Sequence, residues 1–386
     1  MATHPQGTEL YPAARLGQAA AAAGQAGIGA LLLTPGPDLR YVAGYDATAL
    51  ERLTCLVIAA PGRGLDPFLV VPRLELPAAQ ASPAGRLDLE LVPWAETEDP
   101  YQLITGRLRA AGIAGAPGEP GTVGVSDRML ALALLRFRGE LGDTGMVLAS
   151  TALRDLRMRK SAAEVTALLE AGAAIDRVQA QVPGWLRPGR TEREVGADIA
   201  EAIVAEGHAR ADFTIVASGP NAASPHHELS DRVLGAGDAV VVDIGGTMPS
   251  GYCSDCTRTY AIGSPPASFA AYYAVLKDAQ EAACAAVKPG VAAEQIDAAA
   301  REPISAAGFG EWFFHRTGHG IGLETHEDPY IVAGNAEPLA PGMAFSVEPG
   351  IYPGPHGARI EDIVVCTEAG AQLANNASRE LIVVDA

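Results

Sequence analysis

The sequence contains few positively charged residues. Its 28 Lys and Arg residues stand against 46 Asp and Glu residues, which gives a formal net charge of −18 at pH 7. Nucleic acids and anionic membrane surfaces are bound mainly through clustered Lys and Arg side chains. The charge balance therefore argues against a nucleic acid or a membrane as the partner of this protein.

Cysteines are also scarce, and they form no disulfide framework. The five cysteines are scattered over 386 residues, an odd number that is unlike the dense pattern of a disulfide-stapled domain. Cys253 and Cys256 have C-x-x-C spacing, but no second pair or suitably spaced His follows for a tetrahedral zinc site. Residues three apart on a strand point to opposite faces, so we expect both cysteines to pack as ordinary strand residues.

Long apolar segments are missing as well. The first seven residues lack the basic start and the apolar centre of a signal peptide. The longest weakly polar stretch, residues 17–34, consists mostly of Ala and Gly, which is typical of a helix leading into a strand rather than of a membrane span. We therefore expect a cytoplasmic protein.

The length and the pattern of apolar residues predict two domains. Short apolar strand-like segments alternate with Ala-rich helical segments up to about residue 157, which indicates an α/β domain. From residue 158 onward, longer helices alternate with strands that are joined by turns, which indicates an α+β domain. We predict the domains at residues 1–157 and 158–386.

Capping-box spacing marks the start of two helices in the second domain. Ser161 with Glu164 and Thr191 with Glu194 place Ser or Thr three residues before Glu. Helices are expected at residues 162–182, 195–206, 268–287 and 292–307. Strands are expected at residues 239–245, 252–262, 343–348 and 359–367.

Four acidic residues lie in or beside apolar strand-like segments: Asp243, Asp255, Glu348 and Glu361. Burying a carboxylate is costly unless a cation or several hydrogen bonds compensate its charge. A single such residue is usually a hydrogen-bonded structural carboxylate. Here the turn at residues 247–251 would bring the first two together on a hairpin, and the connection at residues 349–357 would join the strands of the other two.

Four carboxylates in one place repel one another and raise each other's pKa values, and divalent cations remove this conflict. Seven of the eight histidines follow residue 200, so an imidazole is available beside these carboxylates. An oxygen-rich site with one imidazole suits Mn²⁺, Co²⁺, Fe²⁺ or Zn²⁺. Four carboxylates favour two metal ions that share bridging oxygens.

These residues and their surroundings resemble the pita-bread metallopeptidases, the family of creatinase, aminopeptidase P and prolidase (Xaa-Pro dipeptidase). The similar segments of the second domain are TIVASGPNAASPHH, DIGGTMPSGYCSDCTRT, HRTGHGIGLETHEDP, FSVEPGIY and ARIED, in the order of the family. LRYVAGY resembles a part of the family's N-terminal domain. The resemblance implies an α/β creatinase-like N-terminal domain and an α+β pita-bread catalytic domain.

The resemblance also implies a dinuclear metal site. Asp243 would hold one metal ion, and His319 and Glu348 would hold the other. Asp255 and Glu361 would bridge the two ions. We expect Mn²⁺ first, with Co²⁺, Zn²⁺ and Fe²⁺ as alternatives.

Proton transfer and hydrogen bonding complete the implied mechanism, in which a bridging hydroxide attacks the scissile carbonyl of an Xaa-Pro bond. Glu348 would carry the proton to the leaving nitrogen. His226 and His326 would donate hydrogen bonds to the substrate carbonyl and to the developing oxyanion. His227 is adjacent to His226, and the resemblance favours His226 as the residue that faces the metals.

Three further residues have weaker signals. Arg359 is two residues before Glu361, so we expect it on the same strand face, where it would orient that carboxylate. His315 is expected to be structural, because the glycines around His319 argue against a helical pair of ligands. His356, in a Pro- and Gly-rich loop, would either line the substrate entrance or lie on the surface.

The expected substrate is a small peptide with proline in the second position, and the resemblance implies a homodimer. The motifs are compatible with both dipeptidase and aminopeptidase activity. Three alternatives share the fold: a hydrolase or lyase acting on a non-peptide small molecule, a metal-free creatinase-like hydrolase, and a non-catalytic binding homologue. The intact set of five ligand residues argues against the last two.

Overall fold

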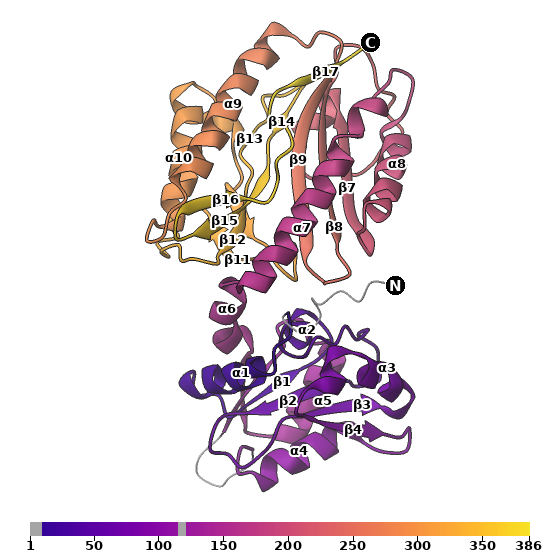
Figure 1. Ribbon diagram of the computed structural model, residues 1–386, viewed down its shortest axis with the longest axis vertical. Coiled ribbons are helices and arrows are strands. Elements are labelled where there is room, and N and C mark those ends of the chain that lie inside the picture. Colours follow the sequence, from indigo (N-terminus) through magenta and orange to yellow (C-terminus); the bar gives the residue numbers. More distant parts are fainter. Residues whose placement is uncertain (1–9, 115–120) are drawn as a thin grey trace. The chain divides into compact units, whose positions relative to one another are not determined.

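A computed structural model describes residues 10–114 and 121–386 (Figure 1). The first seven residues, where no signal peptide is predicted, lie outside these ranges. The chain divides into two compact units, one ending at Arg157 and the other running from Met158 to Ala386. Each unit has its own buried apolar core.

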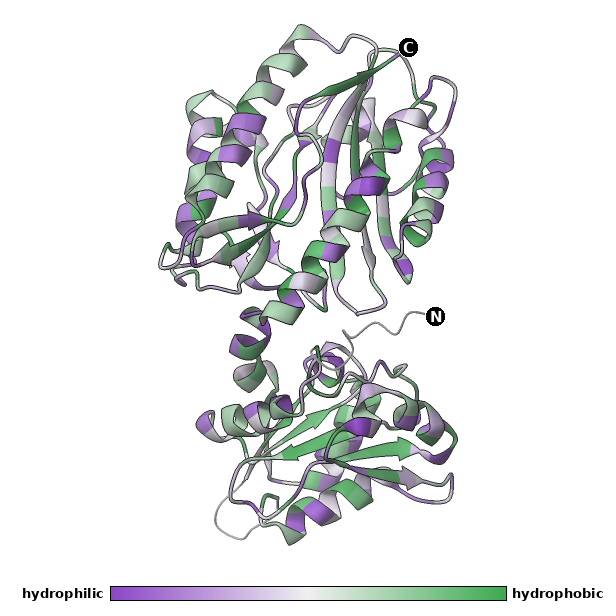
Figure 2. Ribbon diagram, viewed as in Figure 1, coloured by the Kyte–Doolittle hydropathy of each residue, from purple (hydrophilic) through white to green (hydrophobic). Residues whose placement is uncertain are grey.

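The first unit is built around a six-stranded mixed sheet with the order β4-β3-β2-β1-β5-β6. Its strands are β1 (Ala30–Leu33), β2 (Cys55–Ala59), β3 (Phe68–Pro72), β4 (Glu90–Trp94), β5 (Thr122–Val125) and β6 (Gly145–Leu148). β1 pairs antiparallel with β2 and β2 antiparallel with β3, whereas the other neighbours are parallel. The central strands are apolar along their whole length because they are buried on both faces (Figure 2).

Helices surround this sheet and account for the Ala-rich segments between the strands. They are α1 (Ala14–Gln25), α2 (Pro37–Ala43), α3 (Leu76–Ala81), α4 (Pro100–Ala110), α5 (Ala131–Leu141) and α6 (Ser150–Met158). The first unit is thus an α/β domain, as predicted.

The second unit contains two larger antiparallel sheets and a short pair of strands. A four-stranded sheet has the order β17-β9-β8-β7, and a five-stranded sheet has the order β11-β10-β12-β15-β16. The strands are β7 (Arg210–Ser218), β8 (Ala239–Thr247), β9 (Cys253–Ile262), β10 (Gly318–Gly320), β11 (Glu327–Ile331), β12 (Ala344–Val347), β13 (Gly350–Ile351), β14 (Ala358–Arg359), β15 (Asp362–Thr367), β16 (Gly370–Leu373) and β17 (Ile382–Val384). Only β17 pairs parallel with its neighbour in these sheets.

Four helices lie outside these strands, with α7 and α8 beside β7–β9 and α9 and α10 on the opposite side of the unit (Figure 1). They are α7 (Ala162–Gln179), α8 (Glu192–Ala205), α9 (Ala267–Ala286) and α10 (Ala293–Ala306). Both predicted capping boxes, at Ser161 and at Thr191, are present. Among the helices of the described chain, none has the length and apolarity to cross a membrane.

The structure of the second unit differs from the predicted elements at several places. The predicted strand at residues 359–367 is broken, because the backbone N–H groups of Ile360 and Glu361 bond to Pro349 and Thr257 instead of continuing one ladder. The helix predicted to reach residue 182 ends at Gln179 and gives way to a 3₁₀ turn. β7, β10, β11, β13, β16 and β17 are not among the predicted strands.

Helix α7 fixes β8 and β9, the two strands that carry Asp243 and Asp255. The Gln179 amide donates to the backbone carbonyls of Cys256 on β9, at 2.9 Å, and of Val242 on β8, at 3.3 Å. The Tyr260 hydroxyl donates to Gln179 Oε1 at 2.7 Å. Cys253 and Cys256 are both buried free thiols in β9, so they pack within the strand as expected.

The close approach of α7 to the chain near Ala374 predicts an unusual effect of Gly172→Ala. A Cβ atom at Gly172 would lie 2.4 Å from the backbone oxygen of Ala374. Glycine to alanine inside a helix ordinarily stabilises by about 0.5–1 kcal/mol, but overpacking costs about 1–3 kcal/mol. We expect Gly172→Ala to lower the midpoint of urea-induced unfolding.

Gly106→Ala in α4 is the matched control, because nothing lies within 4 Å of its added Cβ. This variant should unfold at the same or a higher urea concentration than the parent protein. An equal increase for both variants would contradict the close contact at Gly172.

Candidate metal centre

A cavity of about 650 Å³ opens in the second unit. Nine of the residues singled out in the sequence line it: Asp243, Asp255, His319, Glu348, Glu361, His226, His326, Arg359 and His315. These residues are up to 135 positions apart in the chain, yet the structure brings them to one site.

Asp243 and Asp255 come together through the register of β8 and β9. Asp243 lies opposite Thr257, and Asp255 lies opposite Gly245. The two acidic residues are therefore two positions out of direct register, which places them diagonally on the same face of the sheet. Both are buried, with 8% and 3% of their surface exposed.

Glu348 and Glu361 come together through β12 and β15. Val347, the last residue of β12, pairs with Asp362, the first residue of β15. Glu348 directly follows Val347, and Glu361 directly precedes Asp362. Both carboxylates therefore lie at the same end of this antiparallel pair. The predicted pairing of the two strands beside these residues is correct, although Glu348 and Glu361 each lie just outside their strand.

His319 reaches the carboxylates from β10. A glycine stands on each side of it in this strand, because a larger residue would collide with the neighbouring backbone. A Cβ at Gly318 would lie 1.8 Å from the backbone oxygen of Ser346, and one at Gly320 would lie 2.2 Å from that of Asp328. His319 Nε2 lies 3.2 Å from a Glu348 oxygen and 3.8 Å from an Asp255 oxygen. Its Nδ1 lies 3.1 Å from the carbonyl oxygen of Gly320, which orients the ring.

The negative charges of these carboxylates are only partly compensated by hydrogen bonds and positively charged neighbours. Within the described ranges, one buried oxygen each of Asp243, Asp255 and Glu361 has no hydrogen-bond partner. Burial, followed by the charge of Glu361, raises the pKa of Asp255 well above its usual range. Burial, followed by the negative charge of Glu348, likewise raises the pKa of Glu361 well above its usual range.

Glu348 behaves differently. Burial raises its pKa, but the hydrogen bond with His319 and the positive charge of Arg359 lower it more, to about 2. The Glu348 carboxylate is therefore ionised at neutral pH, whereas the site disfavours the charged forms of Asp255 and Glu361.

The donor set fits divalent cations. Asp255, His319 and Glu361 each offer one atom, and these atoms lie within 4.8 Å of one another. The unpartnered oxygens are the groups that a cation would bind, and carboxylate oxygens with one imidazole suit a divalent transition metal. A cation there would also remove the electrostatic cost of burying adjacent carboxylates.

Arg359 does not bind the carboxylate that the sequence suggested. Its Nη2 donates to Asp243 Oδ2 at 2.6 Å instead of contacting Glu361 directly. It is linked to Glu361 through Thr257, whose hydroxyl accepts from Arg359 Nε at 3.2 Å and donates to Glu361 Oε2 at 2.8 Å. The cause is the break after β14, which removes Arg359 and Glu361 from a common strand.

The histidines fall into distinct environments. His226 and His326 line the cavity, whereas His227 Nε2 donates to the buried carboxylate of Glu192 at 2.8 Å. Burial and the neighbouring His319 lower the pKa of His326 to about 4. His315, expected to be structural, bonds to the Tyr352 hydroxyl at 3.1 Å and also lines the cavity.

His356 is not among the residues that line the cavity, and its ring packs against Phe269 instead, with centroids 6.3 Å apart. Its backbone oxygen accepts a hydrogen bond from Tyr272. Lining residues that the sequence analysis did not single out are Phe213, Ile215, Ser224, Pro225, Phe314, Arg316 and Thr325. All of these except Phe213 and Phe314 lie in the segments that resemble the family, which is the signal that could have found them.

Comparison with known proteins identifies the family. The profile of "Metallopeptidase family M24" matches residues 166–368, and that of the "Creatinase/Prolidase N-terminal domain" matches residues 15–159. The chain belongs to metallopeptidase family M24. It is therefore a metallopeptidase that works with divalent metal ions, and the predicted family, fold class and enzyme class are confirmed.

Relatives of this M24 peptidase span nearly its whole length. The "Probable dipeptidase PepE" of Mycobacterium tuberculosis is 55% identical over 377 residues, which cover 97% of either chain. The "Xaa-Pro dipeptidase" of Lactobacillus helveticus is 34% identical over 351 residues, 90% of this chain and 92% of that protein. The crystal structure of dipeptidase PepE from Mycobacterium ulcerans has a TM-score of 0.88 and 56% identity, covering 97% of this chain and 98% of that one.

Metal binding should release protons, because Asp255 and Glu361 have raised pKa values and must be ionised to hold a cation. The apparent affinity for Mn²⁺ should therefore fall as the pH is lowered through these raised values. Calorimetric titration in two buffers of different ionisation enthalpy measures the protons released per metal ion. A binding enthalpy that is the same in both buffers at every pH would contradict the raised pKa values.

Thr257→Val should weaken metal binding, since the hydroxyl links Arg359 to Glu361 and valine has nearly the same shape. Loss of such an outer hydrogen bond typically costs about 10–100-fold in metal affinity. The affinity is measured by competition with a chelator. Thr367→Val is the control, because that hydroxyl bonds only within the turn at Gly370; an equal loss in both variants would count against the role of Thr257.

Proposed function

We propose that this M24 peptidase hydrolyses Xaa-Pro bonds in dipeptides and short peptides, and that it uses two divalent metal ions per chain. The observation that carries the proposal is the convergence of three buried carboxylates, the partly buried Glu348 and His319 on one cavity, with three carboxylate oxygens unpartnered within the described chain. Such an arrangement is costly for a purely structural site and suits a pair of cations.

The proposed ligands follow the family pattern residue by residue. Asp243 would hold one ion, His319 and Glu348 would hold the other, and Asp255 and Glu361 would contribute to both. We propose Mn²⁺ as the metal, with Co²⁺, Zn²⁺ and Fe²⁺ as alternatives that the same ligands accept. Metal ions held there would lower the pKa of water, so that a nucleophile able to attack a carbonyl carbon is available at neutral pH.

The residues of the chain then handle protons and developing charge. Glu348 is ionised, so a carboxylate oxygen of this residue can take the proton of the attacking water and deliver it to the leaving nitrogen. His326, whose low pKa keeps it neutral at pH 7, donates one N–H to the carbonyl oxygen as negative charge develops there. His226 lines the same cavity and donates a second hydrogen bond.

The cavity also offers an apolar surface for the substrate. Phe213, Ile215 and Phe314 line it together with the polar groups. A proline ring is apolar and rigid, and the Xaa-Pro bond has no N–H for a peptidase to bind. The name of the Lactobacillus helveticus relative supports this specificity, and the names of the mycobacterial relatives support a dipeptide substrate.

Two expectations concern the protein in its cell. The homodimer follows from the resemblance to the family, and the cytoplasmic location follows from the sequence. Both remain predictions.

A peptide series tests the activity. Xaa-Pro dipeptides and Xaa-Pro-Yaa-Zaa peptides are assayed in parallel with Mn²⁺, Co²⁺ and Zn²⁺, with Xaa-Ala peptides as the matched control. We expect metal-dependent release of the first residue from the proline peptides and much slower cleavage of the alanine peptides. Metal-loaded protein that cleaves no Xaa-Pro peptide would instead favour a non-peptide substrate.

A further inference from the structure

The side chain of His226 is not held by hydrogen bonds within the described chain, although it faces the proposed reaction site. It lies in a turn between β7 and β8, after the 3₁₀ segment Gly219–Ala223, and is exposed to the cavity. Within the described parts of the chain, its imidazole makes no hydrogen bond. The direction of this ring must therefore be set by its neighbours in the chain.

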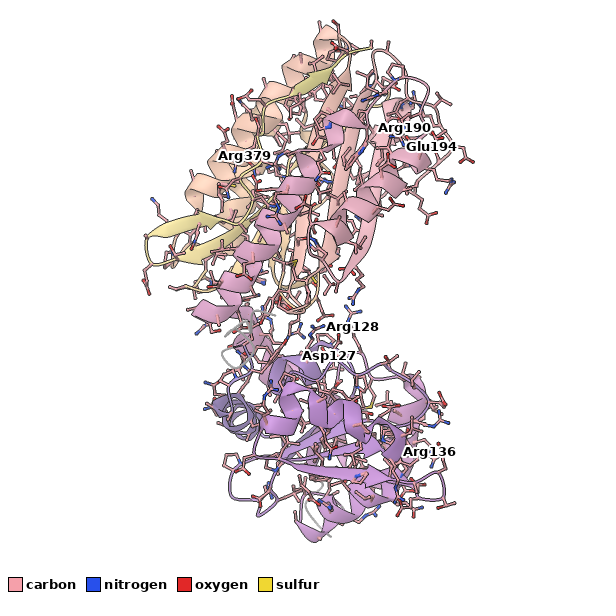
Figure 3. The ribbon with its side chains drawn as sticks, turned by 45° about the vertical axis from the view of Figure 1, so that its right-hand side comes forward. Asp127, Arg128, Arg136, Arg190, Glu194 and Arg379 are labelled. Carbon is pink, nitrogen blue, oxygen red and sulfur yellow. The ribbon has the colours of Figure 1, made fainter. Side chains whose placement is uncertain are left out.

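The residue after it is firmly held. His227 Nε2 donates to Glu192 Oε2 at 2.8 Å, and the Glu192 side chain is fully buried at the start of α8. Glu194, two residues further on, points outward at this end of the helix (Figure 3). Glu192 is thus an inward-facing carboxylate on a helix whose N-terminal end favours negative charge.

Glu192 collects hydrogen bonds from both ends of the segment that contains His226. Ser218, the last residue of β7, donates its N–H and its hydroxyl, each at 2.7 Å. The Asn221 amide donates at 3.0 Å, and the Ser230 hydroxyl also donates to this carboxylate, at 2.5 Å. One buried side chain therefore fixes the segment at positions before and after the turn.

The residue before His226 is held from the other side. Arg359 Nη1 donates to the backbone oxygen of Pro225 at 3.1 Å, while Nη2 of the same guanidinium binds Asp243 at 2.6 Å. His226 is thus flanked by one neighbour bound to the carboxylate site and another bound to α8. Neither Glu192 nor His227 lines the cavity.

We propose that Glu192 and His227 are positioning residues that aim His226 at the substrate. The inference rests on the proposed function of His226 as a hydrogen-bond donor in peptide hydrolysis. The Glu192–His227 hydrogen bond, together with the Arg359–Pro225 bond, limits rotation of the two peptide units around His226. A donor that is already oriented needs no reorganisation during the reaction, which is where its contribution to rate arises.

A double-mutant cycle between His226 and His227 tests the proposal. His227→Leu removes the N–H that Glu192 accepts, and we expect kcat to fall about tenfold with KM within about twofold, because the lost interaction acts in the transition state. In the His226→Ala background, the same substitution should change kcat by less than about twofold, since its target is gone. Equal losses of kcat in both backgrounds would overturn the proposal.

His227→Gln is the matched variant, because its amide can still donate to Glu192. It should recover most of the activity lost in His227→Leu, and failure to do so would count against the hydrogen bond. In Glu192→Gln, one carboxylate oxygen becomes an amide group that donates instead of accepting, so it conflicts with the donors around it, His227 included. We expect this variant to reproduce the kinetics of His227→Leu. If Glu192→Gln does not fold, the His227 variants decide the question.

A spectroscopic measurement separates this inference from the proposed function. The His226 ring signal is assigned in a spectrum of ¹³C-labelled histidine by its loss in His226→Ala. It should shift or broaden in His227→Leu and return toward its original position in His227→Gln. This result would hold even if no Xaa-Pro peptide were cleaved, whereas an unchanged His226 signal in His227→Leu would refute the positioning role.

Discussion

The electrostatic cost of placing four carboxylates in one buried site is the constraint on which the rest of this structure depends. Arg359 neutralises Asp243 directly and is linked to Glu361 through Thr257. This compensation is incomplete, because burial and mutual repulsion still raise the pKa values of Asp255 and Glu361. A cation bound in this cavity would therefore stabilise the charged form of Asp255 and Glu361.

The fold meets this constraint by combining two antiparallel strand pairs. β8 with β9 carries one pair of carboxylates and β12 with β15 presents the other, so each pair depends on strand register alone. The registers are in turn fixed from outside the site. α7 holds β8 and β9 through Gln179, and glycines on both sides of His319 let β10 pack against its neighbours.

Local patterns in the sequence were sufficient to predict the parts of the site that depend on neighbouring residues. Acidic residues in apolar strands, the turn after β8 and the two capping boxes are local signals, and the structure contains each of them. The expectation that Arg359 and Glu361 share a strand face was wrong, because the chain leaves the strand at Ile360 through hydrogen bonds to distant residues. The contact of His227 with Glu192 joins residues 35 positions apart, and no local spacing indicates it.

Two adjacent residues show that the incomplete compensation is specific to the metal centre. Asp362 is fully buried, and it binds Arg258 at 2.6 Å, Arg379 at 2.6 Å (labelled in Figure 3) and the Gln280 amide at 2.8 Å. Glu361, its neighbour, receives one hydroxyl and retains an unpartnered buried oxygen within the described chain. The same fold thus supplies two guanidinium groups to a structural carboxylate and no direct one to the carboxylate beside it. A purely structural role for Glu361 would leave that difference unexplained, because removing a charge partner from a buried carboxylate costs several kcal/mol, on the order of 3–5. A cation in the cavity accounts for it.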